Sequence, residues 1–290
     1  MFHRILVPTD GSEAAATAAS VAIALADRFD AAVHAVHVVD LSDVPSSVQS
    51  DATTELQRQG EAAVESVADR AADTDVPVTT RVLESPRPVH EELLDYVADE
   101  GVDLVVMGTH GRTGLARIVL GSVTERLLRV SPVPVLTVHE DSGLDTAPES
   151  VLVPTDGSDA ANAAADRAVA LAAATGAGLQ VVYVVDPTAA AGEYGSADVL
   201  EALEMAGQRA VGDVVARAED AGVGTIEASV LGGATARAIL DYAADRDVDL
   251  VAMGTHGRTG LERYLLGSVT EKVVRVAEMP VLTVSAHDEE

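Results

Sequence analysis

The sequence predicts an α/β protein made of two tandem Rossmann-like domains. Two observations carry this prediction. First, apolar segments typical of buried strands alternate with alanine-rich or charged helical patterns along the chain. Second, the alternation occurs twice: ILVPTDGSEAA starts at residue 5 and VLVPTDGSDAA at residue 151, and this offset of 146 residues recurs in the middle and at the end of each half. A constant offset indicates duplication of a whole domain, and 290 residues fit two domains of ordinary size.

Local signals define the elements of the first half. RILVPT suits a strand that is covered on both faces. Ser12 is a suitable N-cap for the alanine-rich helix that follows, and Pro88 is well placed to open the third helix. The expected strands are residues 4–9, 31–40, 77–84, 103–108 and 134–139. The expected helices are residues 12–29, 48–73, 88–100 and 122–130. The second half repeats this order, with strands near residues 150–155, 178–186, 225–231, 249–254 and 280–285.

Regular alternation of strand and helix implies a parallel sheet with helices on both faces and right-handed crossovers. We therefore expect a five-stranded sheet in each half, with strand order 3-2-1-4-5, and a pseudo-two-fold relation between the halves. The expected domains are residues 1–140 and 149–290. Residues 141–148, which are polar and contain Gly and Pro, are the expected linker.

The charge of the chain is strongly negative, with 47 acidic against 19 basic residues and a formal net charge of −28. The acids are spread along the helices rather than gathered in a tail. Such a field argues against nucleic acid as a partner. A dispersed acidic surface that is poor in lysine suits high salt, so we expect a halophilic protein from an acidic proteome. An ordinary acidic cytosolic protein is the alternative.

The chain has no cysteine, which excludes thiolate metal sites and thiol redox chemistry. No apolar run reaches the roughly 18–20 residues of a membrane span. The start of the chain, MFHRILVPTD, does not have the layout of a signal peptide. We therefore expect a cytoplasmic protein without a membrane partner.

One stretch of each half carries the chemistry. Residues 107–130 read MGTHGRTGLARIVLGSVTERLLRV, and residues 253–276 repeat 18 of these 24 positions. Each copy holds Gly-x-x-Gly, nine residues and then Gly-Ser, between a strand and a helix. Backbone N–H groups at such a helix start, together with the helix dipole, favour a phosphate. The loop and the Pro-Thr-Asp turn after the first strand both lie at the carboxyl edge of the sheet, where such folds bind ligands. The pattern predicts a nucleotide-binding loop in each half.

The chain resembles tandem members of the universal stress protein family. The resemblance rests on VPTDGS near the start of each half and on GTHGRTGLxRxxLGSVTE near each end, and it covers nearly the full length. The branch of this family that binds ATP carries Gly-x-x-Gly, nine residues and Gly-Ser or Gly-Thr. Both halves keep that pattern, so the resemblance implies two ATP sites.

The resemblance also implies which residues surround the nucleotide. The turn after the first strand borders the adenosine, Val38 and Met107 face the adenine, and the glycine loop with the following helix start surrounds the phosphates. In the first half the implied residues are Pro8, Thr9, Asp10, Val38, Met107, Gly108, Gly111, Gly121, Ser122, Val123 and Thr124. In the second half they are Pro154, Thr155, Asp156, Val184, Met253, Gly254, Gly257, Gly267, Ser268, Val269 and Thr270. Beside the loop glycines, Arg112 and Arg258 can supply guanidinium groups to phosphate.

Structural interpretations stand beside these assignments. Loop glycines can serve packing or a positive φ alone, and Asp10 and Asp156 can be turn residues. His110 and His256 have no second ligand at metal-binding spacing, so we expect no metal site; a local hydrogen bond or a phosphate contact suits them better. His34 and His37 lie on opposite faces of a strand and are expected to be structural.

The sequence contains no catalytic pair of carboxylates, no Ser-His-Asp arrangement and no Walker lysine. Hydrolysis requires a positioned water and charge stabilisation in addition to a phosphate cradle. Asp10 and Asp156 can hold Mg²⁺ together with the nucleotide. We expect an ATP-binding protein that acts as a nucleotide-dependent sensor or signalling protein in the stress response, with little or no hydrolysis and no catalytic residues. A slow ATPase or phosphotransferase and a nucleotide-free interaction module are the alternatives.

The last strand of each half is apolar and expected at a sheet edge, and such strands tend to pair. In the family, two domains associate through this strand. We therefore expect the halves to form an intramolecular pseudo-dimer, and two chains can associate in turn.

Overall fold

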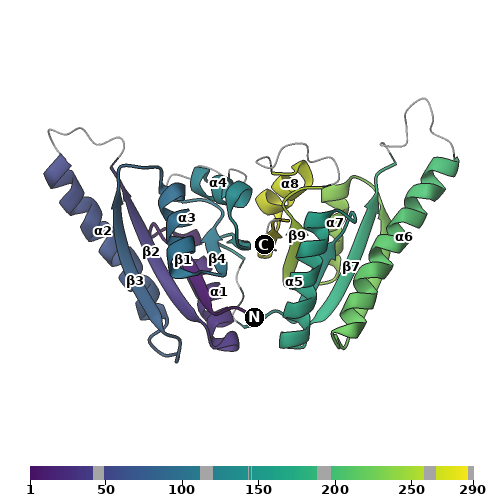
Figure 1. Cartoon of the computed structure of the whole chain (residues 1–290), viewed down its shortest axis with the longest axis horizontal. Coiled ribbons are helices and arrows are strands. Elements are labelled where there is room, and N and C mark those ends of the chain that lie inside the picture. Colours follow the sequence, from purple (N-terminus) through teal and green to yellow (C-terminus); the bar gives the residue numbers. More distant parts are fainter. Residues whose placement is uncertain are drawn as a thin grey trace. The chain divides into compact units, whose positions relative to one another are not determined.

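The computed structural model describes residues 1–41, 49–111, 120–142, 144, 146–187, 197–257 and 266–286. The chain divides into two compact units at the boundary between Ala147 and Pro148. Strands and helices alternate along the chain in both units, as the sequence predicts (Figure 1).

The first half contains β1 (Arg4–Pro8), α1 (Glu13–Phe29), β2 (Ala32–Asp40), α2 (Gln49–Arg70), β3 (Val78–Ser85), α3 (Val89–Glu100), β4 (Leu104–Gly108), α4 (Ser122–Val130) and β5 (Val135–Val138). The second half contains β6 (Ser150–Pro154), α5 (Asp159–Thr175), β7 (Gly178–Val185), α6 (Ala197–Asp220), β8 (Ile226–Gly232), α7 (Thr235–Asp245), β9 (Leu250–Gly254), α8 (Ser268–Val276) and β10 (Val281–Val284). The elements expected from the sequence are confirmed, and their ends differ by a few residues, as frayed helix ends commonly do.

The strands of each half are parallel and have the predicted order. In the first half the order is β3-β2-β1-β4-β5, and in the second half it is β8-β7-β6-β9-β10. The chain leaves β1 in one direction along the sheet and reaches β4 on the other side of β1. The crevice beyond the carboxyl ends of β1 and β4 is therefore the switch point at which ligands bind in such sheets.

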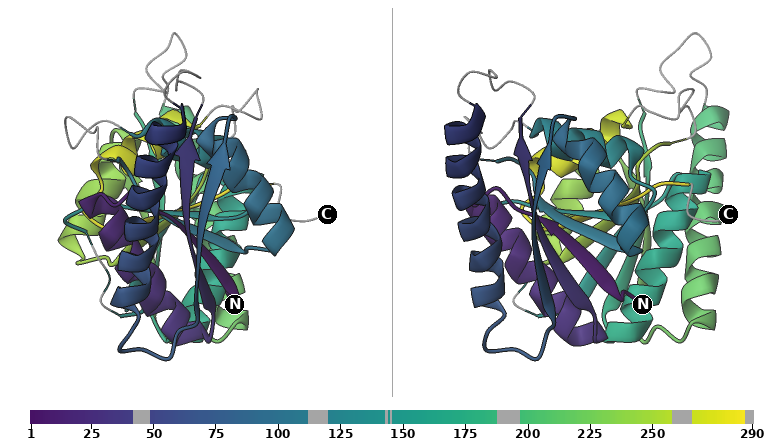
Figure 2. Two further views of the ribbon diagram at one scale, coloured as in Figure 1. Left: turned by 90° about the vertical axis from the view of Figure 1, so that its left-hand side faces the viewer. Right: turned by 60° about the vertical axis from the view of Figure 1, so that its left-hand side comes forward.

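Helices cover both faces of each sheet. In the first half α1 packs beside α2, and α3 packs beside α4. Figure 2 shows α2 and α3 on opposite sides of β2 and β3. The two histidines of β2 lie on opposite faces of the sheet: His34 hydrogen-bonds Tyr96 of α3, whereas His37 faces Gly60 of α2. The expectation that these histidines lie on opposite faces is confirmed.

The central strands are buried on both faces, as their continuous apolar sequences predict. All five residues of β4 and all five of β9 are buried. The helices that cover them are rich in alanine on the inner side, and Ala18, Ala22 and Ala26 of α1 are fully buried. Small side chains allow a helix to approach a sheet closely. At this short distance there is no room for a side chain on Gly108 of β4 or on Gly254 of β9.

Ser12 is the N-cap of α1, as predicted, and Ser158 has the same role in α5. The hydroxyl of Ser12 accepts from the Ala15 N–H at 3.3 Å, and Ser158 does the same for Ala161. Such a cap contributes about 1 kcal/mol to helix stability. The same two helices end differently. Asp30 follows α1 with a φ of 54°, whereas Gly176 follows α5 with a φ of 83°.

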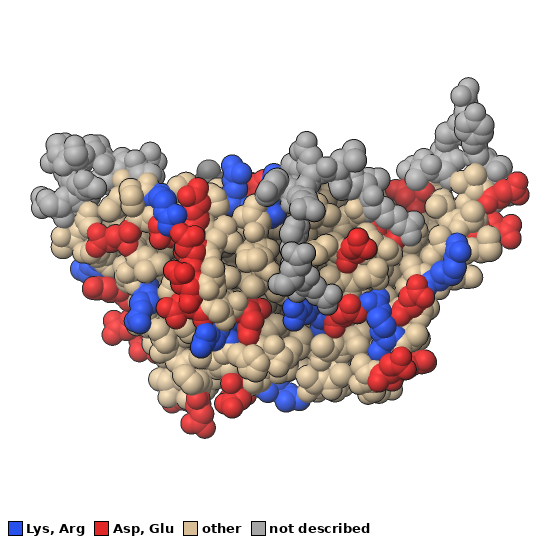
Figure 3. Space-filling model, in the orientation of Figure 1, with Lys and Arg blue, Asp and Glu red and all other residues tan. Residues whose placement is uncertain are grey.

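Acidic side chains are spread over the face drawn in Figure 3 rather than gathered in one patch. Among the described residues, no helix combines the length and the apolar character that a membrane crossing requires. Pairing of the halves through their last strands, their pseudo-two-fold relation and the association of two chains remain predictions.

Candidate functional site

Each half has a cavity at its switch point. The cavity of the first half has a volume of about 340 Å³, and that of the second half about 280 Å³. Each is bordered by the turn after the first strand, the end of the second strand, the start of the third helix, the end of the fourth strand and the start of the fourth helix. Five segments that are far apart in the sequence therefore meet around one volume.

The structure brings the sequence-derived residues together. The lining of the first cavity includes Pro8, Thr9, Asp10, Val38, Met107, Gly108, Gly111, Gly121, Ser122, Val123 and Thr124. The lining of the second cavity includes Pro154, Thr155, Asp156, Val184, Met253, Gly254, Gly257, Gly267, Ser268, Val269 and Thr270. Arg112 and Arg258 lie outside the described residues. Among the described residues that line either cavity, there is no arginine or lysine.

The start of α4 supplies hydrogen-bond donors to the first cavity. Gly121 is the N-cap, its N–H donates to the Thr109 carbonyl at 2.8 Å, and its own carbonyl accepts from Glu125. Within the described part of the chain, no acceptor takes the N–H of Ser122, Val123 or Thr124. These are the unsatisfied donors of a first helical turn, and the helix dipole adds positive potential there. The start of α8 has the same arrangement, with Gly267 bonded to Thr255.

A hydroxyl fixes each of these helix starts to its strand. Thr124 donates through its side chain to the Gly108 carbonyl at 2.9 Å, and Thr270 donates to the Gly254 carbonyl at 2.8 Å. Both threonine side chains are buried. Because each hydroxyl proton is engaged in this way, Thr124 and Thr270 can donate to a ligand only through the backbone N–H.

The loop glycines serve different purposes. A Cβ on Gly108 would lie 2.9 Å from the backbone of Ala14, and one on Gly254 would lie 2.6 Å from the backbone of Ala160. These two glycines are required because the first helix of each domain, α1 or α5, packs directly against the end of β4 or β9. Gly111 and Gly257 have a different surrounding: a Cβ on either would meet the carboxylate of Asp10 or Asp156, so a side chain there would displace that carboxylate.

Gly121 is different from the other glycines of its loop. Its φ of −64° and ψ of 145° suit any residue. A Cβ there would come no closer than 3.4 Å to its neighbours, which is an ordinary contact. The fold of the first half therefore tolerates a side chain at this position, and glycine leaves that volume to the cavity.

Asp10 and Asp156 are turn residues that also line the cavities. The Oδ1 atom of Asp10 accepts from the Ser12 N–H at 3.0 Å, and Asp156 accepts from Ser158 at the same distance. The second carboxylate oxygen, Oδ2, is the atom nearest to Gly111 or Gly257. Each carboxylate thus uses one oxygen for the turn and directs the other toward the glycine loop.

Sequence reasoning missed the wall built by the second strand and the third helix. In the first cavity this wall is Val36, His37, Val89 and Leu93. His37, expected to be structural, does have a structural contact: its Nδ1 donates to the Thr9 carbonyl at 2.7 Å, which fixes its tautomer. It also lines the cavity. The sequence does show that α3 begins at the same edge of the sheet as the loops, which places it near the cavity. No motif, however, marks Val89 or Leu93 as lining residues.

The corresponding wall of the second cavity differs. Val182 and Ile239 correspond to Val36 and Leu93, but Thr235 replaces Val89. Tyr183 replaces His37 and lies against Gly207 of α6. The second cavity therefore has a hydroxyl at the start of α7 where the first has a methyl group.

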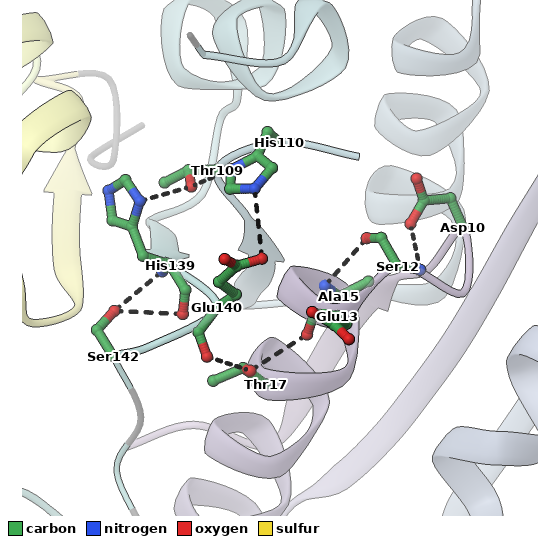
Figure 4. Close-up of polar contacts among 10 residues, drawn as sticks. All are labelled: Asp10, Ser12, Glu13, Ala15, Thr17, Thr109, His110, His139, Glu140 and Ser142. Carbon is green, nitrogen blue, oxygen red and sulfur yellow. Dashed lines mark hydrogen bonds and ion pairs between the residues drawn. The ribbon is translucent and has the colours of Figure 1, made fainter. Parts of the chain in front are cut away.

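His110 lies in a polar cluster at the edge of the first cavity (Figure 4). Its Nδ1 is 3.2 Å from the Thr109 hydroxyl, and that hydroxyl is 3.0 Å from Nδ1 of His139. Its Nε2 is 3.9 Å from a carboxylate oxygen of Glu140. In the second half, His256 Nδ1 lies 2.8 Å from Thr255, and the positions of His139 and Glu140 are occupied by Ser285 and Ala286. The described residues contain no group of three or more histidine, aspartate or glutamate side chains arranged to hold a metal ion.

The comparisons with known proteins agree with this architecture. The model of the universal stress protein family matches residues 1–139 and 148–285. The chain belongs to the universal stress protein family and contains two such domains in tandem.

Some relatives match about one half of the chain, and others match nearly all of it. A universal stress protein of Methanocaldococcus jannaschii is 39% identical over 144 residues, which cover 48% of this chain and 84% of that protein. A universal stress protein of Mycolicibacterium smegmatis is 29% identical over 301 residues and covers 97% of both chains. The crystal structure of a universal stress protein from Archaeoglobus fulgidus covers 98% of both chains with a TM-score of 0.73 and 22% identity. This last likeness shows the tandem fold.

Proposed function

We propose that this protein binds ATP in both cavities and acts as a nucleotide-dependent sensor or signalling protein of the stress response, with little or no hydrolysis. The observation that carries the proposal is the helix start in each cavity, where three backbone N–H groups without a protein acceptor among the described residues face a glycine loop. Such a site suits a phosphate chain.

The strength of binding follows from these donors. A micromolar dissociation constant corresponds to about 8 kcal/mol. A hydrogen bond to a charged group contributes roughly 1.5–3 kcal/mol, so three backbone donors supply about half or more of the requirement. The apolar wall formed by Val36, Val38, Leu93 and Met107 suits the adenine ring, whose burial supplies further free energy. A Walker lysine is therefore not needed.

The carboxylates of Asp10 and Asp156 would repel bare phosphates. They suit a divalent cation that bridges the carboxylate and the phosphate oxygens, since Mg²⁺ is commonly bound by one or two carboxylates plus substrate phosphates. We therefore propose MgATP as the ligand. Holding a metal nucleotide does not provide a general base for water, and this supports a binding role over efficient hydrolysis.

The test is calorimetric titration of the purified protein with ATP and Mg²⁺ in high salt. We expect saturable heat with two nucleotides per chain. Heat no greater than that of buffer dilution rules out the nucleotide function. Release of nucleotide from the purified protein on heat denaturation would count against a nucleotide-free interaction module. Turnover to ADP that is unchanged when both cavities are blocked by Gly121→Val and Gly267→Val would exclude the slow ATPase.

The acidic composition supports a second part of the proposal, namely that the protein works in high salt in the cytoplasm. Forty-seven acids against nineteen bases repel one another in the folded state when salt is low. The Debye length falls from about 10 Å at 0.1 M salt to about 3 Å at 1 M. We expect a higher melting temperature in molar salt than in dilute buffer. Equal melting temperatures would remove the halophilic part of the proposal and leave the nucleotide part intact.

A further inference from the structure

The polar cluster at the first cavity includes the beginning of the segment that joins the domains. We define residues 139–142 as the linker turn. The His139 N–H donates to the Ser142 hydroxyl at 3.0 Å, which closes the turn. The Thr17 hydroxyl of α1 lies 3.0 Å from the Glu140 carbonyl and 3.2 Å from the Glu13 carbonyl, so its one proton serves both (Figure 4). The linker turn is thus anchored on the first domain next to His110.

The hydrogens of the cluster can be assigned from its geometry. Thr109 has one hydroxyl proton but faces two imidazole nitrogens, so one histidine must donate its Nδ1–H to the Thr109 oxygen. A neutral His110 with its proton on Nε2 presents that N–H to the Glu140 carboxylate and makes its Nδ1 an acceptor from Thr109. His139 is then the donor to Thr109. At 3.9 Å the contact with Glu140 is electrostatic rather than a hydrogen bond. The cluster runs in one direction, from His139 through Thr109 and His110 to Glu140.

This arrangement makes His110 sensitive to a ligand. A phosphate in the cavity is a strong hydrogen-bond acceptor for the Nε2–H of His110. When the imidazole turns toward the phosphate, it leaves Glu140, and its Nδ1 moves relative to the Thr109 hydroxyl, so the contact between Thr109 and His139 changes at the same time. The change therefore reaches the linker turn.

The second half lacks each of the side chains that make this connection. At the positions of Thr17, His139 and Glu140, the second half has Ala163, Ser285 and Ala286. The contact between Thr109 and His110 is repeated by Thr255 and His256 beside the second cavity, but the groups beyond it are not repeated. The duplicated domain therefore serves as an internal reference in which the cavity is present and the connection is absent.

We propose that His139 and Glu140 are positioning residues for His110, and that they couple the first cavity, but not the second, to the linker turn. This inference rests on the proposed function, because ATP is the ligand whose binding is transmitted. The two sites then have different roles: ATP binding in the first cavity changes the conformation of the segment between the domains, and ATP binding in the second cavity does not.

The experiment uses a reporter in the linker. The chain has no cysteine, so Thr146→Cys at an exposed linker position gives a unique site for an environment-sensitive fluorophore. In a Gly267→Val background only the first cavity is expected to bind. Titration with MgATP should change the emission. The double variant His139→Ser with Glu140→Ala, which copies the second half, should lose this change and weaken the binding of ATP at the first site by about fivefold, the lower end of typical coupling.

Matched variants separate coupling from general damage. Thr17→Ala, which copies Ala163, releases the Glu140 carbonyl without touching the cavity and should reduce the emission change while calorimetry still detects binding. Glu140→Asp keeps the charge and should retain part of the response. Glu149→Gln removes a carboxylate just beyond the other end of the linker and should leave the response unchanged. A Gly121→Val protein, with only the second cavity open, should bind ATP without a change in the emission of the fluorophore.

The two proposals fail in different ways. Calorimetric binding with an emission change that survives His139→Ser with Glu140→Ala, or that appears in Gly121→Val, overturns the coupling and leaves ATP binding in place. Binding with no emission change in the parent reporter protein does the same. Absence of binding heat in every protein overturns the proposed function and the coupling together.

Discussion

The two halves build the same cavity from the same kinds of residue, but the surroundings of the two cavities differ. Both have the turn aspartate, the helix start and the threonine that ties the helix to the strand. Around the first, Thr17, His139 and Glu140 connect the loop to the linker. Around the second, alanine and serine occupy those positions. The residues that line a cavity determine which class of ligand fits. The residues outside the lining, such as Thr17, His139 and Glu140, determine whether ligand binding can affect the linker.

A second difference lies at the opposite end of the domains. His34 Nδ1 and the Tyr96 hydroxyl are 2.9 Å apart in the first half. The second half has Gln180 and Tyr242 at these positions. Among the described residues, neither Oε1 of Gln180 nor the Tyr242 hydroxyl has a hydrogen-bond partner, although both atoms are buried. The first half therefore satisfies a polar pair that the second leaves unsatisfied.

The largest expected effect separates the two sites. Gly121→Val should fill part of the first cavity, and Gly267→Val part of the second, because each glycine lines its cavity. Each variant should lose one of the two bound nucleotides, with affinity at that site reduced at least about 100-fold, or about 2.7 kcal/mol. Calorimetric stoichiometry measures this, with urea unfolding as the control for folding. Loss of both sites in one single variant would contradict independent cavities.

The next prediction distinguishes glycines required for packing from the one that is not. Gly254→Ala and Gly108→Ala should destabilise the protein by about 1–3 kcal/mol, since overpacking against backbone has that cost. The effect should be larger for Gly254, where the added Cβ would approach backbone at 2.6 Å rather than 2.9 Å. Gly121→Ala should be nearly neutral. Urea unfolding checks all three, and a destabilised Gly121→Ala would show that the distinction is wrong.

Asn substitutions of the turn aspartates test whether their charge serves the ligand. Asp10→Asn and Asp156→Asn keep an oxygen that can accept from Ser12 or Ser158, so the turns should persist. Loss of the carboxylate should remove most of the Mg²⁺ dependence of ATP binding at the affected site, a change of about tenfold, or about 1.4 kcal/mol. Titrations with and without Mg²⁺ measure it. An unchanged Mg²⁺ dependence would leave these residues with the turn role alone.

The His34 and Gln180 positions predict opposite effects in the two halves. Gln180→His should stabilise the second half by about 1 kcal/mol by satisfying Tyr242, and His34→Gln should destabilise the first by a similar amount. Burial lowers the pKa of His34 in the folded state. The unfolded chain therefore binds more protons, and stability should fall as the pH drops through and below about 6.5. Denaturant unfolding at several pH values should show this slope diminished in His34→Gln; an unchanged slope would assign it to other groups.

The smallest effect concerns the ends of α1 and α5. Asp30 holds a positive φ of 54°, which glycine adopts at lower cost. Asp30→Gly should stabilise the first half by up to about 1 kcal/mol, and Gly176→Asp should destabilise the second to a similar degree. Thermal unfolding of both variants measures the difference. Changes of the same sign in both would show that the left-handed conformation is not the cause.

Much of the fold and the outline of the site could be predicted from the sequence. The order of strands and helices depends on local periodicity and on capping residues such as Ser12. The glycine loop and the Pro-Thr-Asp turn are contiguous motifs, and strand order brings both to one edge. The contribution of His37, Val89 and Leu93 could not be predicted, because these residues belong to no motif: the packing of α3 brings Val89 and Leu93 to the cavity, and the bond to the Thr9 carbonyl holds His37 there.

The sequence by itself determined the duplication, the parallel architecture and the class of cavity, because these depend on patterns that are short or that repeat. Only the tertiary structure decided which glycines are obligatory, since that depends on how closely α1 approaches β4. It also decided that Thr17 meets Glu140, 123 residues away, and that Glu140 faces His110. Contacts between distant residues depend on the three-dimensional path of the chain, and they distinguish the two otherwise similar halves.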